Sequence, residues 1–149
     1  MYRITEEKIE DLKEKEVFVF GSNERGDHAG GAARQAQKSF GFPSGKGFGY
    51  SFGGGNDRCF AIPTLNWTKE PLKLEEIQFY VNRFVVFVKK RPDLKFLVTA
   101  IGTGIAGFPV EEMALLFKEA STLFNVYLPK EFWKVLNSKK EENVPEKVE

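Results

Sequence analysis

Short apolar runs alternate along the chain with longer segments in which apolar residues recur at helical spacing. The runs at residues 17–20 and 96–101 are continuous and rich in β-branched and aromatic residues, as is typical of strands buried on both faces of a parallel sheet. In residues 74–90 the apolar positions instead recur every three or four residues, which predicts an amphipathic helix. The remaining strands are predicted at residues 59–63 and 125–128, and the remaining helices at residues 31–40 and from about 110 to 120.

Breaker residues set the ends of several of these elements. Gly41 follows the helix predicted at residues 31–40, in the position that glycine favours just beyond a helix. Residues 6–15 are charged with two apolar positions, which we interpret as a short surface helix, and residues 131–136 are expected to form a last helical turn. Residues 41–57, rich in Gly and Phe, predict a long irregular loop or a ragged hairpin.

The alternation of strands and helices predicts an α/β fold. Parallel strands joined by right-handed crossovers give a three-layer αβα sandwich with a mostly parallel sheet. A chain of 149 residues suits one domain, which we place at residues 1–138. The charged segment at residues 139–149 is predicted to be a disordered tail.

Composition narrows the classes of function. The 22 Lys and Arg residues nearly balance the 21 Asp and Glu residues, so no strong overall field favours nucleic acid or anionic lipid as a partner. The single Cys, Cys59, lies in a predicted strand and excludes an internal disulfide, and with a single His the chain gives no support for a metal site. No apolar run approaches the ~20 residues of a membrane span, and the start does not resemble a signal peptide. We therefore expect a cytoplasmic protein that does not bind membranes.

Fourteen glycines are gathered mostly in three places. One group, GTGIAG at residues 102–107, follows a predicted strand and precedes a predicted helix. Glycines in this context let backbone N–H groups approach phosphate oxygens, although a tight turn that binds nothing has the same pattern. A dinucleotide-binding dehydrogenase is disfavoured, because the strand at residues 125–128 has no carboxylate at its tip.

A second glycine-rich loop spans residues 21–33 and also joins a predicted strand to a predicted helix. Asn23 stands just past the strand, where its amide can bond sugar hydroxyls, and Gly30 and Gly31 open the helix. Ligands of open parallel sheets bind beyond the carboxyl ends of the strands. The two glycine-rich loops are therefore expected at the same edge of the sheet.

Together these two motifs resemble those of the macro domain family. FGSN at residues 20–23 and AGGAA at residues 29–33 are similar to the Asn-containing loop and glycine-opened helix of macro domains. AIGTGIAGFPVEEMA, from Ala100 to Ala114, is similar to their phosphate loop and the helix that follows it. Outside the motifs, across roughly residues 17–128, the likeness is one of element order.

The resemblance implies a site for ADP-ribose or a related nucleotide, with no cofactor. By position, Asn23 would contact the distal ribose, Gly30 and Gly31 would flank the diphosphate, residues 102–107 would wrap the phosphates, and Phe108 would lie near a ribose or the base. The implied ligand-binding residues are Ser22, Asn23, Gly30, Gly31, Gly102, Thr103, Gly104, Ile105, Ala106, Gly107 and Phe108. The chain departs from the family in lacking a matching Gly-Asp turn for the adenine amino group.

Macro-type hydrolases cleave ADP-ribosyl or O-acetyl-ADP-ribose linkages, so the resemblance admits an enzyme whose partner is an ADP-ribosylated protein. Asn23, Asp27 and His28 are the catalytic candidates, because Asp27 and His28 lie in the loop where a water would be oriented. The alternative for Asp27 and His28 is a solvated turn or a helix cap. The alternative for the whole protein is a non-catalytic nucleotide-sensing or interaction module.

Other features have simpler interpretations. Phe48, Tyr50 and Phe52, with Lys46 and Arg58 nearby, would permit single-stranded nucleic-acid binding, but the balanced charge argues against it. Residues 53–55 are compatible with a lid over the site or with a plain solvent loop. Cys59, Trp67 and Trp133 are interpreted as packing residues.

Overall fold

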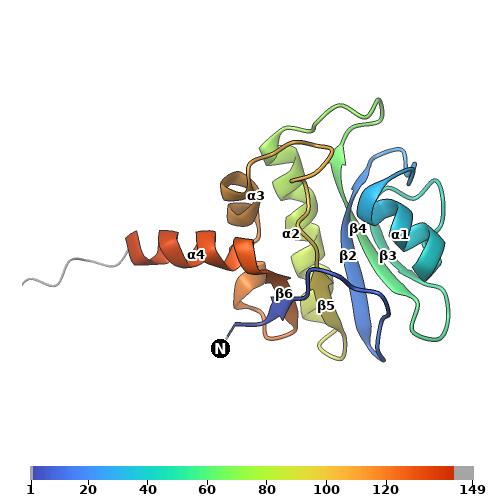
Figure 1. Ribbon diagram of the computed structural model, residues 1–149, viewed down its shortest axis with the longest axis horizontal. Coiled ribbons are helices and arrows are strands. Elements are labelled where there is room, and N and C mark those ends of the chain that lie inside the picture. Colours follow the sequence, from blue (N-terminus) through green and yellow to red (C-terminus); the bar gives the residue numbers. More distant parts are fainter. Residues whose placement is uncertain (1, 143–149) are drawn as a thin grey trace, which may run out of the picture.

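A computed structural model of the protein describes residues 2–142, and it is built around one six-stranded sheet (Figure 1). The order of its strands is β1-β6-β5-β2-β4-β3. The strands are β1 (Ile4–Thr5), β2 (Glu16–Asn23), β3 (Gly49–Phe52), β4 (Arg58–Leu65), β5 (Lys95–Val98) and β6 (Val126–Pro129). Every pairing is parallel except that between β3 and β4.

Helices cover both faces of the sheet, which makes the three-layer αβα sandwich that the sequence predicts. The helices are α1 (Gly31–Phe40), α2 (Leu74–Lys90), α3 (Val110–Leu116) and α4 (Lys130–Glu142), with a 3₁₀ turn at Ala120–Thr122. In Figure 1, α1 lies to the right of the sheet, and α2 and α3 lie to its left. None of the helices in residues 2–142 has the length and apolar character that crossing a membrane requires.

Alternate residues of β2 supply the two halves of the core. Phe18 and Phe20 pack under α1, whereas Val17 and Val19 belong to the larger cluster beneath α2, α3 and α4. Successive side chains of a strand point to opposite faces, so a strand that is apolar at every position must be covered on both sides. This is the physical reason for the unbroken apolar run at residues 17–20.

The two helices with the clearest patterns begin and end where the sequence predicts. Helix α1 stops at Gly41, whose left-handed conformation (φ 70°) lets its N–H donate to the Ala36 carbonyl. Helix α2 buries the apolar face that its spacing defines, and its first turn is capped by Glu76, whose carboxylate accepts the Lys73 N–H at 3.0 Å. Local sequence decides these boundaries.

Several other predictions need correction. Residues 6–15 form no helix, because their two apolar positions offer too little surface to hold a helix against the sheet. Instead Leu12 is buried in the cluster under α1, and the Ile9 carbonyl accepts a hydrogen bond from Gln35. Strand β1, which pairs with β6, has only two residues and no pattern that predicts it.

The ends of three elements, β5, α3 and α4, also differ from the prediction. Strand β5 ends at Val98, three residues early, and α3 ends at Leu116 before the 3₁₀ turn. Helix α4 continues to Glu142, past both the predicted turn and the domain boundary at residue 138, and residues 143–149 of the predicted tail lie outside the described residues. The hairpin alternative for residues 41–57 is confirmed, because β3 pairs with β4.

Phe84 and Phe79 lie on opposite faces of α2 and allow a test of the core. Phe84 is fully buried between Phe60 and Phe96, whereas Phe79 is 56% exposed. We expect Phe84→Ala to lower the free energy of unfolding by about 3–5 kcal/mol, and Phe79→Ala by well under about 1 kcal/mol. Urea unfolding of both variants measures this, and equal losses would contradict the packing described.

Candidate functional site

A cavity of about 300 Å³ opens at the carboxyl ends of β2, β4 and β5. Three loops form its walls: the loop from β2 to α1, the loop from β4 to α2 and the loop from β5 to α3. Because these strands are parallel neighbours, their carboxyl ends meet at one edge of the sheet. The two glycine-rich loops therefore face each other across the cavity, as expected from their positions after strands.

The cavity brings together most of the residues that the sequence singles out. Those in its lining are Ser22, Asn23, Asp27, Gly30, Gly31, Gly102, Gly104, Ile105 and Ala106. His28, Thr103, Gly107 and Phe108 are not in the lining. Phe108 packs against the core beneath α2 and α3 instead.

The amino end of α1 forms one wall. Gly30 caps the helix without a side-chain hydrogen bond, and the first turn holds no acidic residue. Gly31, Ala32 and Ala33 line the cavity, and amide N–H groups in a first helical turn have no acceptor within the helix. This wall therefore offers hydrogen-bond donors and the positive end of a helix dipole to an anion.

The turn after β5 forms the opposite wall and is held by its own hydrogen bonds. Gly102 has φ 80°, and its carbonyl accepts the Phe108 N–H at 2.9 Å. A Cβ at this position would lie 2.7 Å from the terminal methyl of Met113, so glycine is needed for both conformation and space. The Thr103 hydroxyl closes the turn by donating to the Ala100 carbonyl at 2.8 Å.

Ile105 of one glycine-rich loop lies close to Gly30 of the other. A Cβ at Gly30 would lie 3.7 Å from Cδ1 of Ile105, although Ile105 itself is 79% exposed. A side chain at position 30 would thus be in ordinary contact with Ile105 of the facing loop. A single solvent-facing side chain borders the opening here.

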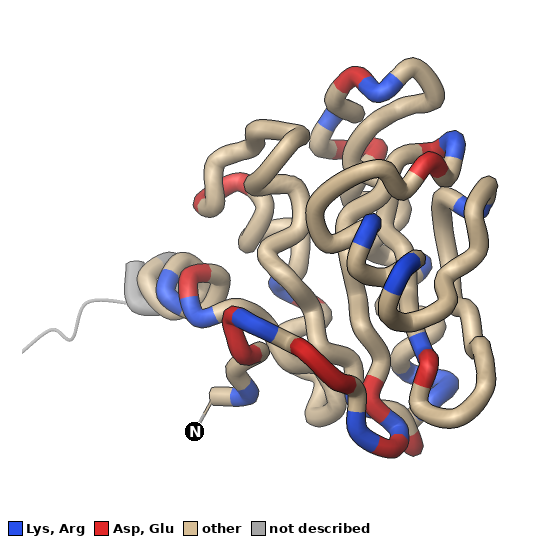
Figure 2. The backbone as a smooth tube through the Cα atoms, turned by 45° about the vertical axis from the view of Figure 1, so that its right-hand side comes forward, with Lys and Arg blue, Asp and Glu red and all other residues tan. Residues whose placement is uncertain are grey.

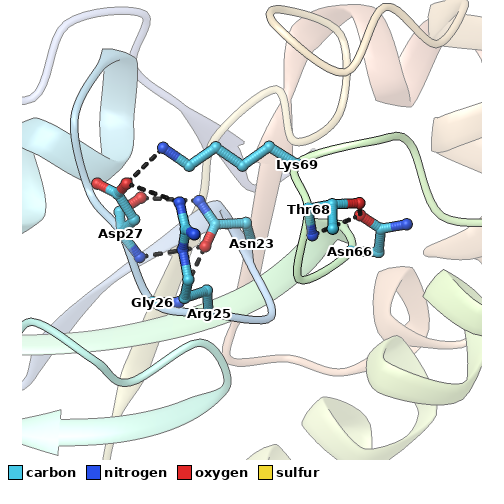
Figure 3. Close-up of polar contacts among 7 residues, drawn as sticks. All are labelled: Asn23, Arg25, Gly26, Asp27, Asn66, Thr68 and Lys69. Carbon is cyan, nitrogen blue, oxygen red and sulfur yellow. Dashed lines mark hydrogen bonds and ion pairs between the residues drawn. The ribbon is translucent and has the colours of Figure 1, made fainter.

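Asn23 shapes the loop that carries Asp27. Its Nδ2 donates to the Asp27 carbonyl at 2.8 Å, and its Oδ1 accepts the N–H groups of Gly26 at 2.9 Å and Asp27 at 3.1 Å (Figure 3). The side chain is buried, and these three bonds engage both ends of its amide. The geometry therefore gives Asn23 a role in holding the loop, and the predicted ribose contact stays a prediction.

Asp27 is the charged residue of this loop that reaches the cavity. Its carboxylate pairs with the Lys69 ammonium and with the Arg25 guanidinium, the latter at 3.4 Å. The hydrogen bond from Lys69 lowers the pKa of Asp27 below its usual value. Asp27 is therefore ionised at neutral pH and is suited to accept rather than donate a proton.

His28 lies away from the cavity although it follows Asp27 directly. Its ring packs edge-on against Phe20 and Phe42, with centroid distances of 5.8 and 5.2 Å. Its Nε2 lies 3.1 Å from the Lys46 carbonyl. Burial lowers the pKa of His28, so the ring is neutral at pH 7. Its contacts with Phe20, Phe42 and Lys46 hold the loop on the side away from the cavity.

Sequence reasoning missed Lys69 and two threonines in the lining, Thr64 and Thr99. Lys69 belongs to the loop after β4, which has no glycine motif to mark it. The signal available was the rule that placed the other two loops, since β4 was also predicted as a parallel strand. The loop that follows β4 should then begin at the same edge of the sheet as the other two loops.

The remaining candidates lie outside this cavity. The glycines at residues 53–55 join β3 to the start of β4, the opposite end of the strand from the cavity, so the lid interpretation is wrong. Trp133 is buried as predicted, whereas Trp67 is 61% exposed and is not a packing residue. Cys59 is a buried free thiol, as predicted.

The aromatic residues considered for nucleic acid mostly pack within the fold. Phe48 lies against Phe60 and Tyr80, and Tyr50 lies against Phe87. Phe52 is exposed and carries Arg58 over its ring. Within residues 2–142, no three His, Cys, Asp or Glu side chains are grouped so that they could hold a metal ion.

Comparison with known proteins supports the fold alone. No family model matches the chain, and no curated protein matches it. A solved structure of a protein of unknown function from Bacteroides thetaiotaomicron is similar, with a TM-score of 0.61 at 14% sequence identity. The match covers 80% of this chain and 90% of that one, so the α/β architecture is shared across most of both.

Gly102 and Gly104 provide a matched test of the turn after β5. Gly104 has open space around the position of a Cβ and no left-handed backbone, in contrast to Gly102. We expect Gly102→Ala to lower the free energy of unfolding by about 1–3 kcal/mol and Gly104→Ala by less than about 0.5 kcal/mol. Thermal and urea unfolding compare them, and a fully stable Gly102→Ala protein would refute the packing against Met113.

The buried His28 predicts a pH dependence of stability. Its pKa is lower in the folded than in the unfolded chain, so the unfolded chain binds the proton more readily below about pH 6.5. The stability contributed by neutral His28 is present above that pH and is lost as the pH falls toward the folded pKa. We expect the stability advantage of the wild type over His28→Gln to shrink between pH 7.5 and 5.5 in urea unfolding, and a constant difference would contradict burial of the neutral ring.

Proposed function

We propose that the cavity binds ADP-ribose or a related nucleoside diphosphate ester. The observation that carries this proposal is the convergence of the α1 amino end and the Gly102–Ala106 turn on one cavity. Diphosphates are recognised by backbone N–H groups that approach without intervening side chains. Glycines line both walls, and the resemblance to macro domains names ADP-ribose as the first ligand to test.

The charges around the cavity fit an anionic ligand. Lys69 lies in the lining, and Arg25 pairs with the same carboxylate of Asp27. This group of three side chains carries a net charge of +1, which is the difference between its two cations and one anion. Figure 2 shows Lys and Arg residues interspersed with Asp and Glu residues over the rest of the chain, so the attraction is local to the site.

A second hollow gives room for a ligand longer than a diphosphate. It has a volume of about 280 Å³ and shares Thr99 and Ala100 with the first cavity. Glu6, Glu7 and Glu131 line it, and carboxylates accept hydrogen bonds from amino groups such as those of a nucleobase. The proposal places the nucleoside end of the ligand in this hollow and its diphosphate in the first cavity.

The geometry supports binding better than hydrolysis. Among the three catalytic candidates, the Asn23 amide is engaged by backbone groups and His28 is outside the lining. Asp27 alone brings an ionised group to the cavity. Hydrolysis of O-acetyl-ADP-ribose or of an ADP-ribosylated protein therefore stays a prediction, and turnover that disappears in Asp27→Ala would support it.

Calorimetric titration with ADP-ribose, ADP and ribose 5-phosphate tests binding, and we expect ADP-ribose to bind most tightly. Gly104 offers two matched variants, because a side chain there enters open space without backbone strain. We expect Gly104→Glu to weaken ADP-ribose binding at least about tenfold through like-charge repulsion. The affinity of Gly104→Lys for ADP-ribose is expected to stay within about threefold of the wild type, because attraction of the ammonium to the ligand offsets the added bulk.

Two results would contradict the proposal. If neither ADP-ribose nor ADP binds the folded wild-type protein, the ligand class is wrong. If Gly104→Glu and Gly104→Lys weaken binding equally, the ligand does not place its negative charge beside this turn.

A further inference from the structure

Lys69 adopts an unusual backbone conformation beside the cavity. Its φ of 66° is left-handed, and in residues 2–142 only Lys15 among other non-glycine residues shares such a value. This conformation is uncommon for a residue with a long side chain and is maintained only where neighbouring structure requires it. The loop around Lys69 therefore has a defined shape.

Asn66 builds that shape. Its Oδ1 accepts the N–H groups of Thr68 and Glu70, each at 2.9 Å, and its carbonyl accepts the Lys69 N–H at 2.9 Å. The Asn66 N–H in turn donates to the Glu70 carbonyl at 2.7 Å. These bonds, drawn in part in Figure 3, fix the point from which the Lys69 side chain starts.

From this loop the Lys69 side chain reaches across to Asp27. Figure 3 shows the extended side chain with its ammonium directed at the carboxylate, and the two residues are 42 positions apart in sequence. Both side chains are 38% exposed, and both residues line the cavity. An ion pair exposed to this extent contributes little to stability, so little is lost if the two groups separate.

Arg25 provides Asp27 with a second partner. Its guanidinium is 3.4 Å from the same carboxylate oxygen, and Asn23 holds the Asp27 backbone independently of the carboxylate. If Lys69 leaves, the charge of Asp27 remains compensated and its loop remains in place. The arrangement therefore contains one cation that can be released.

We infer that Lys69 is a phosphate-recognition residue that exchanges Asp27 for the ligand. A diphosphate carries more negative charge than one carboxylate, so an ammonium between the two is drawn to the phosphate. The Asp27 carboxylate holds Lys69 at the cavity wall until an anion enters. This inference rests on the proposed function and adds the side chain that would select an anionic ligand.

Calorimetry with ADP-ribose and, separately, with inorganic pyrophosphate tests this exchange. We expect Lys69→Met to weaken the binding of both ligands about tenfold or more, because one charge-assisted hydrogen bond is lost. Asp27→Asn is expected to bind both at least as tightly as the wild type, because Lys69 no longer has a competing carboxylate. The matched control is Lys89→Met, which removes a lysine paired with Glu119 outside the cavity and should leave both affinities unchanged.

The outcomes separate the inference from the proposed function. If ADP-ribose binds the wild type and Lys69→Met with affinities within about threefold, Lys69 is not a recognition residue and the proposed function stands. If pyrophosphate binds in a Lys69-dependent way and neither ADP-ribose nor ADP binds, the proposed function falls and the anion site stands. If neither ligand binds the folded wild type, both fall. If Asp27→Asn weakens binding as much as Lys69→Met, the pair acts as a unit and release of Lys69 is refuted.

Discussion

The hydrogen bonding of β2 to β4 on one side and to β5 on the other determines where the site lies. The register aligns Phe18 with Cys59 of β4 and with Leu97 of β5, so the three strands run in the same direction through the middle of the sheet. Their following loops must then leave from the same edge. Burial of β2 on both faces fixes this register, because a shift of one residue would exchange the two halves of the core.

Much of the fold could be predicted from local pattern, and the failures have a common physical cause. Helices α1 and α2 have complete apolar faces and clear end signals, and their observed bounds match the predicted ones. Residues 6–15 and strand β1 are determined by distant partners instead. Leu12 is buried by the α1 side of the sheet, and Ile4 is paired with Leu128, so nothing in their immediate neighbours reveals their conformation.

The site likewise has features that follow from local sequence and features that depend on distant residues. Glycine-rich loops after predicted strands were enough to locate the cavity walls, because glycine reports a backbone requirement that is local. The direction of individual side chains was not predictable. Asp27 and His28 are neighbours, yet Asp27 reaches the cavity and His28 is buried against Phe20. Lys69 was missed for the converse reason, since its importance arises from a contact with a residue far away in sequence.

Ile105, which lies close to Gly30 at the cavity, is a residue whose identity the fold does not depend on. Ile105 is exposed and contributes nothing to either buried cluster, so evolution can exchange it for a larger or smaller residue at little thermodynamic cost. Proteins with the same sheet and the same glycine-rich walls can therefore differ in the residue that borders the cavity here. The size of the opening can therefore change while the scaffold stays the same.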